Sequence, residues 1–277
     1  MRVDSHQHFW RYDPVRDGWI TDEMAVLKRD FLPSDLFPRL RSSGINACVA
    51  VQADQSENET QFLLDLAENH AEIAGVVGWI NLLDENVADR LAYFSQFTKL
   101  RGFRHVVQAE PDDRFLMRKD FLRGIGMLAG FGFTYDILIY ERHLPVANEF
   151  VQQFPEQKFV IDHIAKPQIK DRSLDAWARG IRAIARYPNV WCKISGLVTE
   201  ADWKRWTAND ICPYLDIVFE AFGVDRLMFG SDWPVCLLAA SYGRVKSIVE
   251  DYTQPLPAAD KEKIFGENAI RFYGLAA

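Results

Sequence analysis

Short apolar runs rich in β-branched and aromatic residues alternate along the chain with longer segments of helical periodicity. The apolar runs predict eight strands, at residues 2–8, 47–52, 75–80, 100–105, 133–137, 158–163, 190–195 and 227–232. Their ends follow one another at intervals of about 32 residues on average. This interval fits a strand, a crossover helix and the next parallel strand.

The segments between the runs carry apolar residues three and four positions apart, as amphipathic helices do. The clearest stripes lie in residues 62–67, 121–128, 177–184 and 211–222, and the first follows a capping-box pattern from Ser56 to Glu59. No linker divides the chain, so the pattern predicts one α/β domain over residues 1–277, a (β/α)8 TIM barrel. Neither a GxGxxG nor a GxxxxGK[ST] loop is present, which disfavours nucleotide-dependent chemistry.

Composition limits the partners and the location. The chain has 39 acidic and 32 basic residues and a net charge of −7, so we expect no nucleic-acid partner. No run approaches the ~20 apolar residues that span a bilayer, and the first residues lack the apolar core of a secretory signal. The four cysteines stand at wide spacings with no CxxC. We therefore expect a cytoplasmic protein with no membrane partner.

Candidate chemistry gathers at the predicted strand ends, where a TIM barrel carries its active site. His6 and His8 lie two residues apart near the end of the first strand, so both imidazoles should face the same side. His163 is expected to end the sixth strand and Asp232 the eighth. Imidazole and carboxylate ligands suit zinc, so His6, His8 and Asp232 are predicted to hold a divalent ion. The alternative is a hydrogen-bonded group of histidines with a capping aspartate and no metal.

Other polar residues at strand ends have two interpretations each. Arg104 is predicted to bind a substrate oxygen with its fork of donors; alternatively, it pairs with Asp136 on the next strand. Lys193 and Asp136 would bind hydroxyl groups of a polyol or belong to a supporting salt bridge. Four tryptophans would stack on a sugar ring or belong to ordinary packing: Trp10, Trp19, Trp79 and Trp233.

Five segments of the chain carry a resemblance to a known family. They are Asp4–Trp10, Leu100–His105, Ile161–Pro167, Gly230–Pro234 and Gly266–Ala269. Together they resemble the amidohydrolase-2 branch of the amidohydrolase superfamily. Within that branch they are most similar to sugar-lactone lactonases of the L-fucono-lactonase and L-rhamnono-lactonase type, and more distantly to pyrone-dicarboxylate lactonase. The similarity runs from residue 1 to about residue 274.

The resemblance implies a (β/α)8 hydrolase whose reaction centre is lined by His6, His8, His163 and Asp232. Many members of the superfamily bridge two metals with a carbamylated lysine or a glutamate on the fourth strand. This chain has Arg104 and His105 there. The resemblance therefore implies one divalent ion, often zinc, or none.

Together with these residues, the resemblance implies an enzyme of carbohydrate catabolism that hydrolyses a sugar lactone, L-fucono-lactone or a related six-deoxy aldono-lactone, to the aldonic acid. Asp232 is the expected general base on a water held by a metal or by His6 and His8. The metal or His163, with help from Arg104, is expected to stabilise the developing oxyanion. The alternatives are a metal-dependent non-oxidative decarboxylase, a lactonase acting on a pyrone dicarboxylate, and a non-catalytic binding barrel.

The small-molecule partner is expected to be neutral. A dicarboxylate substrate should need several cations, and only Arg104 and Lys193 are expected as cations at the strand ends.

Overall fold

Eight parallel strands form a barrel in the computed structural model, which describes residues 1–276. The strands are β1 (Val3–Gln7), β2 (Ala47–Val51), β3 (Ile73–Gly78), β4 (Leu100–His105), β5 (Thr134–Ile137), β6 (Phe159–Ile161), β7 (Val190–Ile194) and β8 (Leu227–Phe229). Each pairs with the next in sequence order. The barrel closes between the ends of β1 and β8, where the amide of Asp232 donates to the carbonyl of His6 at 2.9 Å. The predicted (β/α)8 barrel is confirmed.

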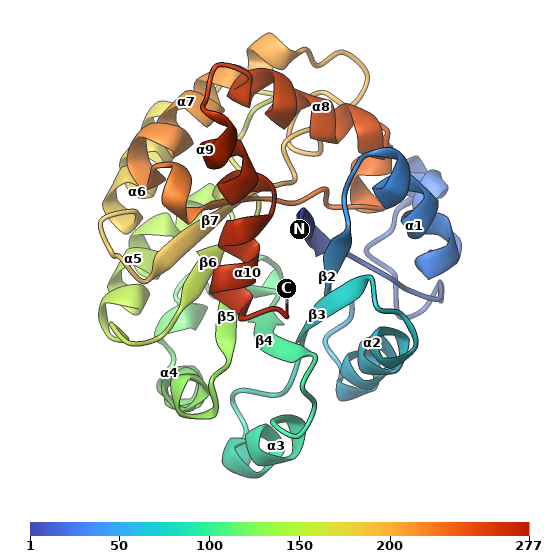
Figure 1. Cartoon of the computed structure of the whole chain (residues 1–277). Coiled ribbons are helices and arrows are strands. Elements are labelled where there is room, and N and C mark those ends of the chain that lie inside the picture. The colour runs from blue at the N-terminus through green and yellow to red at the C-terminus, as the bar shows by residue number, and fades with distance from the viewer. Residues whose placement is uncertain (277) are drawn as a thin grey trace.

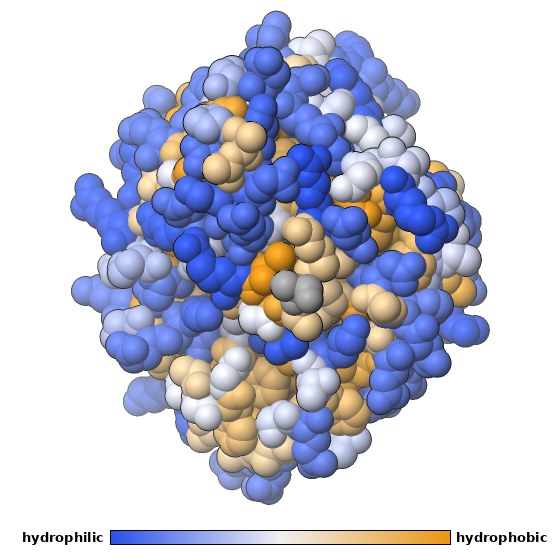
Figure 2. All heavy atoms as spheres, viewed as in Figure 1, coloured by the Kyte–Doolittle hydropathy of each residue, from blue (hydrophilic) through white to orange (hydrophobic). Residues whose placement is uncertain are grey.

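Helices surround the barrel and cover its outer face (Figure 1). They are α1 (Pro33–Ser42), α2 (Glu57–Asn69), α3 (Val87–Phe94), α4 (Lys119–Leu128), α5 (Leu144–Gln152), α6 (Asp175–Ile184), α7 (Ala208–Phe222), α8 (Tyr242–Thr253), α9 (Ala258–Glu262) and α10 (Asn268–Tyr273). Within residues 1–276, none of them is long and apolar enough to cross a membrane. Helix α10 crosses the end of the barrel at which the strands begin, close to both termini (Figure 1). On this face, apolar residues gather near the end of α10 within a mostly hydrophilic surface (Figure 2).

The four apolar stripes seen in the sequence fall on α2, α4, α6 and α7, so these helix predictions are confirmed. The capping box at α2 is half formed. The Ser56 hydroxyl accepts from the amide of Glu59, as predicted. The Glu59 carboxylate does not accept from the amide of Ser56, as a complete capping box would require. It accepts from the amides of Ala53 and Asp54, at 2.8 and 3.2 Å. Glu59 therefore holds the loop after β2.

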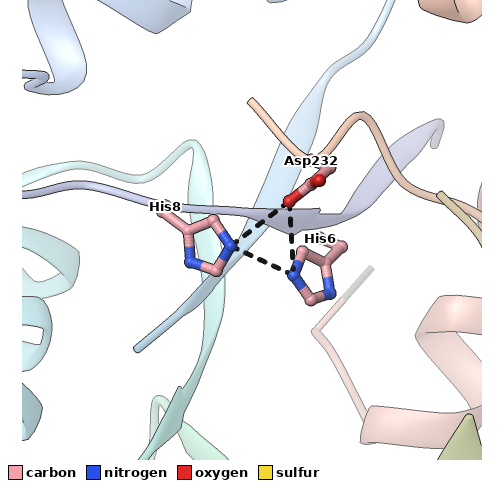
Figure 3. Close-up of side chains that lie close together, drawn as sticks. All are labelled: His6, His8 and Asp232. Carbon is pink, nitrogen blue, oxygen red and sulfur yellow. Dashed lines mark hydrogen bonds and ion pairs between the residues drawn. The ribbon is translucent and has the colours of Figure 1, made fainter. Parts of the chain in front are cut away.

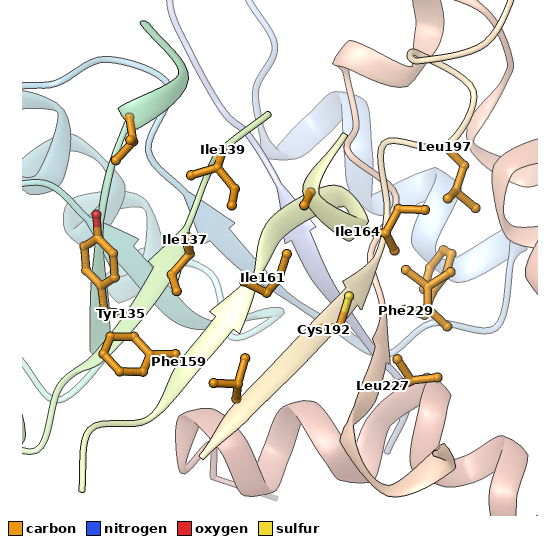
Figure 4. Close-up of a cluster of buried hydrophobic side chains, with 14 of the residues drawn as sticks. Tyr135, Ile137, Ile139, Phe159, Ile161, Ile164, Cys192, Leu197, Leu227 and Phe229 are labelled. Atoms are coloured by element: carbon orange, nitrogen blue, oxygen red, sulfur yellow. The ribbon is translucent and has the colours of Figure 1, made fainter. Parts of the chain in front are cut away.

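Alternating residues of the strands build two separate cores. One set points outward and packs against the helices; part of it, from β5 to β8, is shown in Figure 4. The other set fills the barrel at its α10 end and comprises mainly small aliphatic side chains, among them Val3, Val49, Val77, Val160 and Met228. Phe272 and Tyr273 of α10 close this inner core from below.

Six of the eight predicted strands end one to three residues earlier than expected, and the difference matters most at β6 and β8. β6 stops at Ile161 and β8 at Phe229, so His163 and Asp232 lie in the loops that follow and not on the strands. The reason is local backbone geometry. Both residues have positive φ, 52° at His163 and 56° at Asp232, which is incompatible with an extended strand. The prediction that they end strands was wrong by a few residues, although it placed them at the correct end of the barrel.

Candidate active site

His6 and His8 point into the same space at the end of β1. The register of β1 against β2 shifts between Asp4 and Gln7, a bulge that re-aims the side chains after it. The two Nε2 atoms lie 3.2 Å apart (Figure 3). The prediction that both imidazoles share one face is therefore confirmed.

Asp232 reaches the same point from the loop after the neighbouring strand β8, and His163 reaches it from the turn after β6. Oδ1 of Asp232 lies 3.5 Å from Nε2 of His8 and 3.9 Å from Nε2 of His6 (Figure 3). It lies 3.9 Å from Nε2 of His163 as well. The structure thus brings together four residues that stand up to 226 positions apart in the sequence.

The loops that present His163 and Asp232 adopt an unusual backbone. Four consecutive residues, from His163 to Lys166, have left-handed φ angles between 46° and 59°. Such conformations cost free energy in non-glycine residues and tend to gather at functional sites. Gly196 leaves the space that the ring of His163 occupies, because a Cβ there would lie 2.7 Å from it. The surroundings therefore hold His163 in a conformation that the local sequence does not favour.

Hydrogen bonds fix the orientation of two of the imidazoles. Nδ1 of His8 lies 2.8 Å from the carbonyl of Val51, which can only accept, so His8 carries its proton on Nδ1. Its Nε2 therefore presents a lone pair. Nδ1 of His163 lies 2.8 Å from the hydroxyl of Ser195. In each ring the Nε2 atom is the one that faces Asp232.

Burial sets the charges at this point. It lowers the pKa of His163 to about 4 and that of His6 well below its ordinary value. Burial alone would raise the pKa of Asp232, but His163 and His8 outweigh it and hold that pKa below its ordinary value. At neutral pH, His6 and His163 are neutral and Asp232 is a carboxylate. It can accept a proton.

A buried layer of charged groups lies directly beneath the three imidazoles and Asp232. Arg104 donates from Nη1 to Oδ2 of Asp162 at 3.0 Å, and Lys193 lies 2.5 Å from Oδ2 of Asp136 and 3.0 Å from Oδ1 of Asp162. The suggested pairing of Arg104 with Asp136 is therefore wrong. The two residues face each other in register, but the long arginine side chain extends toward the next carboxylate, Asp162, whereas Asp136 is taken by Lys193 and the hydroxyl of Tyr273.

A cavity of about 350 Å³ opens above the histidines. Its lining comes from the loops after β1, β2, β4, β5, β6 and β8, and includes His8, Arg104, His163 and Asp232. Trp10 and Trp19 form part of the wall, whereas Trp79 and Trp233 do not. A larger hollow of about 670 Å³ contains none of the predicted site residues. The predicted site residues therefore line the smaller cavity, which is of ordinary size for a small ligand.

The cations of the cavity differ from those expected. Lys193 lies below it and does not line it, while Arg16 and Lys166 join Arg104 in its wall. Each has an acidic partner: Arg16 pairs with Asp17 at 2.8 Å, Arg104 with Asp162 at 3.0 Å and Lys166 with Glu200 at 3.6 Å. Arg104 and Lys193 do lie on strands at this end, as expected, but the side chain of Lys193 points below the cavity, and the loops after β1 and β6 add Arg16 and Lys166.

A family model described as amidohydrolase matches residues 3–275. The chain belongs to the amidohydrolase family. It is 46% identical to an L-fucono-1,5-lactonase from Burkholderia multivorans, over 99% of this chain and 96% of the relative. It is 36% identical to an L-fucono-1,5-lactonase from Burkholderia ambifaria, over 99% of this chain and 95% of that protein. A crystal structure of an amidohydrolase from Burkholderia multivorans with bound zinc superimposes with a TM-score of 0.97, at 45% identity and full coverage of both chains.

The site of this amidohydrolase fits a divalent ion. One ligand atom each from His6, His8 and Asp232 lie within 4.8 Å of one another. Two imidazoles and a carboxylate are the donors that zinc prefers. A second group of ligand atoms, from His6, Asp162 and His163, also lies within 4.8 Å of one another. His6 belongs to both groups, and Arg104 places a positive charge beside it, with Nη1 3.3 Å from Nε2 of His6.

Sequence reasoning missed Asp162, which contacts Arg104, Lys193 and His6. A signal was present. Val160 belongs to the core inside the barrel, and strand alternation places the residue two positions later on the same side. Ser195, Arg16 and Lys166 were missed as well. They depend on loop geometry, for which the sequence offers no comparable signal.

Proposed function

We propose that this protein hydrolyses a sugar lactone of the L-fucono type to the aldonic acid, with Asp232 as the general base. The observation that carries the proposal is the carboxylate of Asp232 within 4 Å of three imidazole Nε2 atoms at the floor of a cavity. Two L-fucono-1,5-lactonases that match nearly the whole chain support the substrate class and agree with the sequence-based prediction of a lactonase.

Asp232 starts the reaction by taking a proton from a water molecule. It is ionised at neutral pH because the neighbouring His163 and His8 keep its pKa low. The resulting hydroxide attacks the lactone carbonyl carbon. General-base assistance of this kind contributes typically ~100- to 10,000-fold to the rate.

The negative charge that develops on the carbonyl oxygen faces His163 and Arg104. When the Ser195 hydroxyl donates to Nδ1 of His163, the ring carries its proton on Nε2 and donates toward the cavity. Arg104 lines the cavity, and its buried Nε has no hydrogen-bond partner among residues 1–276. Donors preorganised in this way stabilise the charge without moving when it forms.

Protonated Asp232 then returns its proton to the ring oxygen as the bond from the carbonyl carbon to that oxygen breaks. The products are the carboxylic acid and the freed hydroxyl group of the same sugar acid. His6, His8 and Asp232 would hold a divalent ion, which would supply polarisation of the carbonyl and easier ionisation of water.

The lining of the cavity favours a neutral sugar derivative. Arg16, Arg104 and Lys166 are the basic residues among those that line it, and each is already paired with a carboxylate, so a dianion would have to break these pairs. The wall combines polar groups such as Asp54 and Gln55 with apolar ones such as Leu138 and Val235. Such a wall can bind hydroxyl groups and also cover an apolar face.

The test is a panel of lactones followed by acid release. We expect kcat/KM to be highest for L-fucono-lactone, with a steep preference among stereoisomers, when it is compared with L-rhamnono-, D-arabinono- and L-galactono-lactone and with a pyrone dicarboxylate. A site that binds a hydroxyl group leaves buried polar groups unpaired when that group is absent, a penalty that can reach roughly 10,000-fold. The assay is repeated after chelation to measure the contribution of a metal.

Two outcomes would contradict the proposal. A larger kcat/KM for the dicarboxylate would overturn the substrate class. Carbon dioxide release from an aromatic acid, with no lactone turnover, would favour the decarboxylase.

A further inference from the structure

Lys193 is a buried lysine that contacts the candidate metal site from below. Its Nζ lies 2.5 Å from Oδ2 of Asp136, 3.0 Å from Oδ1 of Asp162 and 3.0 Å from Nδ1 of His6. All four side chains are fully buried. Lys193 does not line the cavity, so its role must be exerted through these neighbours.

The contact with His6 fixes the tautomer of the imidazole. An ammonium group only donates, so Nδ1 of His6 must accept, and a neutral ring then carries its proton on Nε2. That Nε2 lies 3.2 Å from Nε2 of His8, which is an acceptor because Nδ1 of His8 donates to Val51. The hydrogen bonds therefore run in one direction, from Lys193 through His6 and His8 to the carbonyl of Val51.

Two other groups near His6 favour the opposite tautomer. Nη1 of Arg104 lies 3.3 Å from Nε2 of His6, but it has a nearer acceptor in Asp162 at 3.0 Å. Oδ1 of Asp162 lies 3.3 Å from Nδ1 of His6 and could accept a proton from it. The contact from Lys193 is shorter than both.

Metal binding needs that opposite tautomer. A metal at His6, His8 and Asp232 takes the lone pair of Nε2, so the proton of His6 must move to Nδ1 and be donated to a partner such as Asp162. The hydrogen bond from Lys193 is then lost. We propose that Lys193 is a positioning residue that holds His6 in the Nε2–H tautomer and thereby weakens the binding of a divalent ion at this site.

Histidine NMR tests the tautomer directly. In chelator-treated wild-type protein labelled with ¹⁵N-histidine, the His6 ring, identified by its loss in His6→Asn, should show a protonated Nε2 and an unprotonated Nδ1. Addition of zinc should reverse the assignment. A proton on Nδ1 in the metal-free protein would overturn the proposal.

Zinc affinity tests the consequence. The variant Lys193→Met/Asp136→Asn removes one positive and one negative charge together, and the asparagine can still accept from Tyr273. In competition with a chromophoric chelator, it should bind zinc ~10- to 100-fold more tightly than wild type. Changes of this size are typical when a residue that hydrogen-bonds a metal ligand is replaced. Asp136→Asn alone, which leaves Lys193 in place, should not tighten binding.

Lys166→Met is the matched control. Lys166 lines the cavity and pairs with Glu200, so this variant removes a positive charge near the site without touching His6. It should change zinc affinity by less than about threefold. Equal tightening in Lys166→Met, or no tightening in the double variant, would contradict the proposal. Neither measurement uses a lactone, so the result stands apart from that of the substrate panel.

Discussion

The two ends of the barrel interior differ sharply although the same strands build both. At the α10 end the interior is filled by aliphatic side chains such as Val49, Val77 and Val160. At the cavity end it is filled by ionised groups, among them Arg104, Asp162 and Lys193, all essentially buried. On β6 and the turn that follows it, the change takes two residues, from Val160 to Asp162.

This difference separates the aliphatic packing that stabilises the barrel from the charged groups that orient the residues of the site. Aliphatic packing is favourable without any partner. Buried charges cost desolvation free energy that only close pairing offsets, and such networks often contribute little net stability. Here they surround His6 and orient it. The barrel therefore places its least favourable interior where the proposed chemistry occurs.

The strongest test of the cavity end is Asp232→Asn. The amide keeps the shape but cannot accept a proton, so kcat on the lactone should fall by ~100- to 10,000-fold, while the circular dichroism spectrum should stay that of wild type. Asp65→Asn, the same change on the exposed face of α2 and away from the cavity, is the control and should keep kcat within tenfold. Retention of more than a tenth of wild-type kcat in Asp232→Asn would remove the assigned role.

Asp162→Asn should destabilise the fold. It leaves Lys193 and Arg104 short of a buried counter-charge, and breaking such a network costs about 3–5 kcal/mol. Chemical denaturation measures the loss. Glu220→Gln, which breaks an exposed pair with Arg182, is the control and should change little. Equal stability of Asp162→Asn and wild type would show that the charged layer is not a tightly coupled unit.

A pH series on Glu59→Gln examines a buried acid that lies outside the barrel interior, at the same end of the barrel as the cavity. Burial raises the pKa of Glu59 from 4.5 to about 7, so the folded protein holds this proton more tightly than the unfolded chain does. The resulting stability is present below pH ~4.5 and is lost as the pH rises through about 7, and it amounts to at most about 3 kcal/mol. Wild type should therefore weaken relative to Glu59→Gln between pH 5 and 7.

Urea denaturation at several pH values gives this difference in the free energy of unfolding. Glu57→Gln, two residues earlier on α2 and paired with Arg90, is the matched control and should show no comparable trend. A constant difference between wild type and Glu59→Gln from pH 5 to 8 would contradict the expectation.

Val160→Ala tests the aliphatic end. Removing two buried methyl groups should cost about 1–3 kcal/mol through lost transfer free energy and the cavity left behind. We expect kcat to stay unchanged, because the substitution lies in the inner core below the charged layer. A loss of activity at unchanged stability would mean that the two ends are not separable.

Much of the fold could be read from local patterns. Strand runs, helical stripes and their spacing predicted the eight units of the barrel, and strand alternation predicted that His6 and His8 share a face. Asp162 could have been found by the same rule, since it lies two residues after Val160. The predicted strand ends placed His163 and Asp232 at the same end of the barrel, and the resemblance to the family implied the same reaction centre.

The sequence by itself determined the barrel, the end that carries the site and five residues that meet there, because periodicity and strand direction are local properties of the chain. The tertiary structure decided what each charged group contacts. Arg104 reaches Asp162 and not Asp136, Lys193 lies beneath His6 and not in the cavity, and His163 sits in a left-handed turn. These outcomes depend on side-chain direction and on neighbours from other strands, which no local pattern encodes.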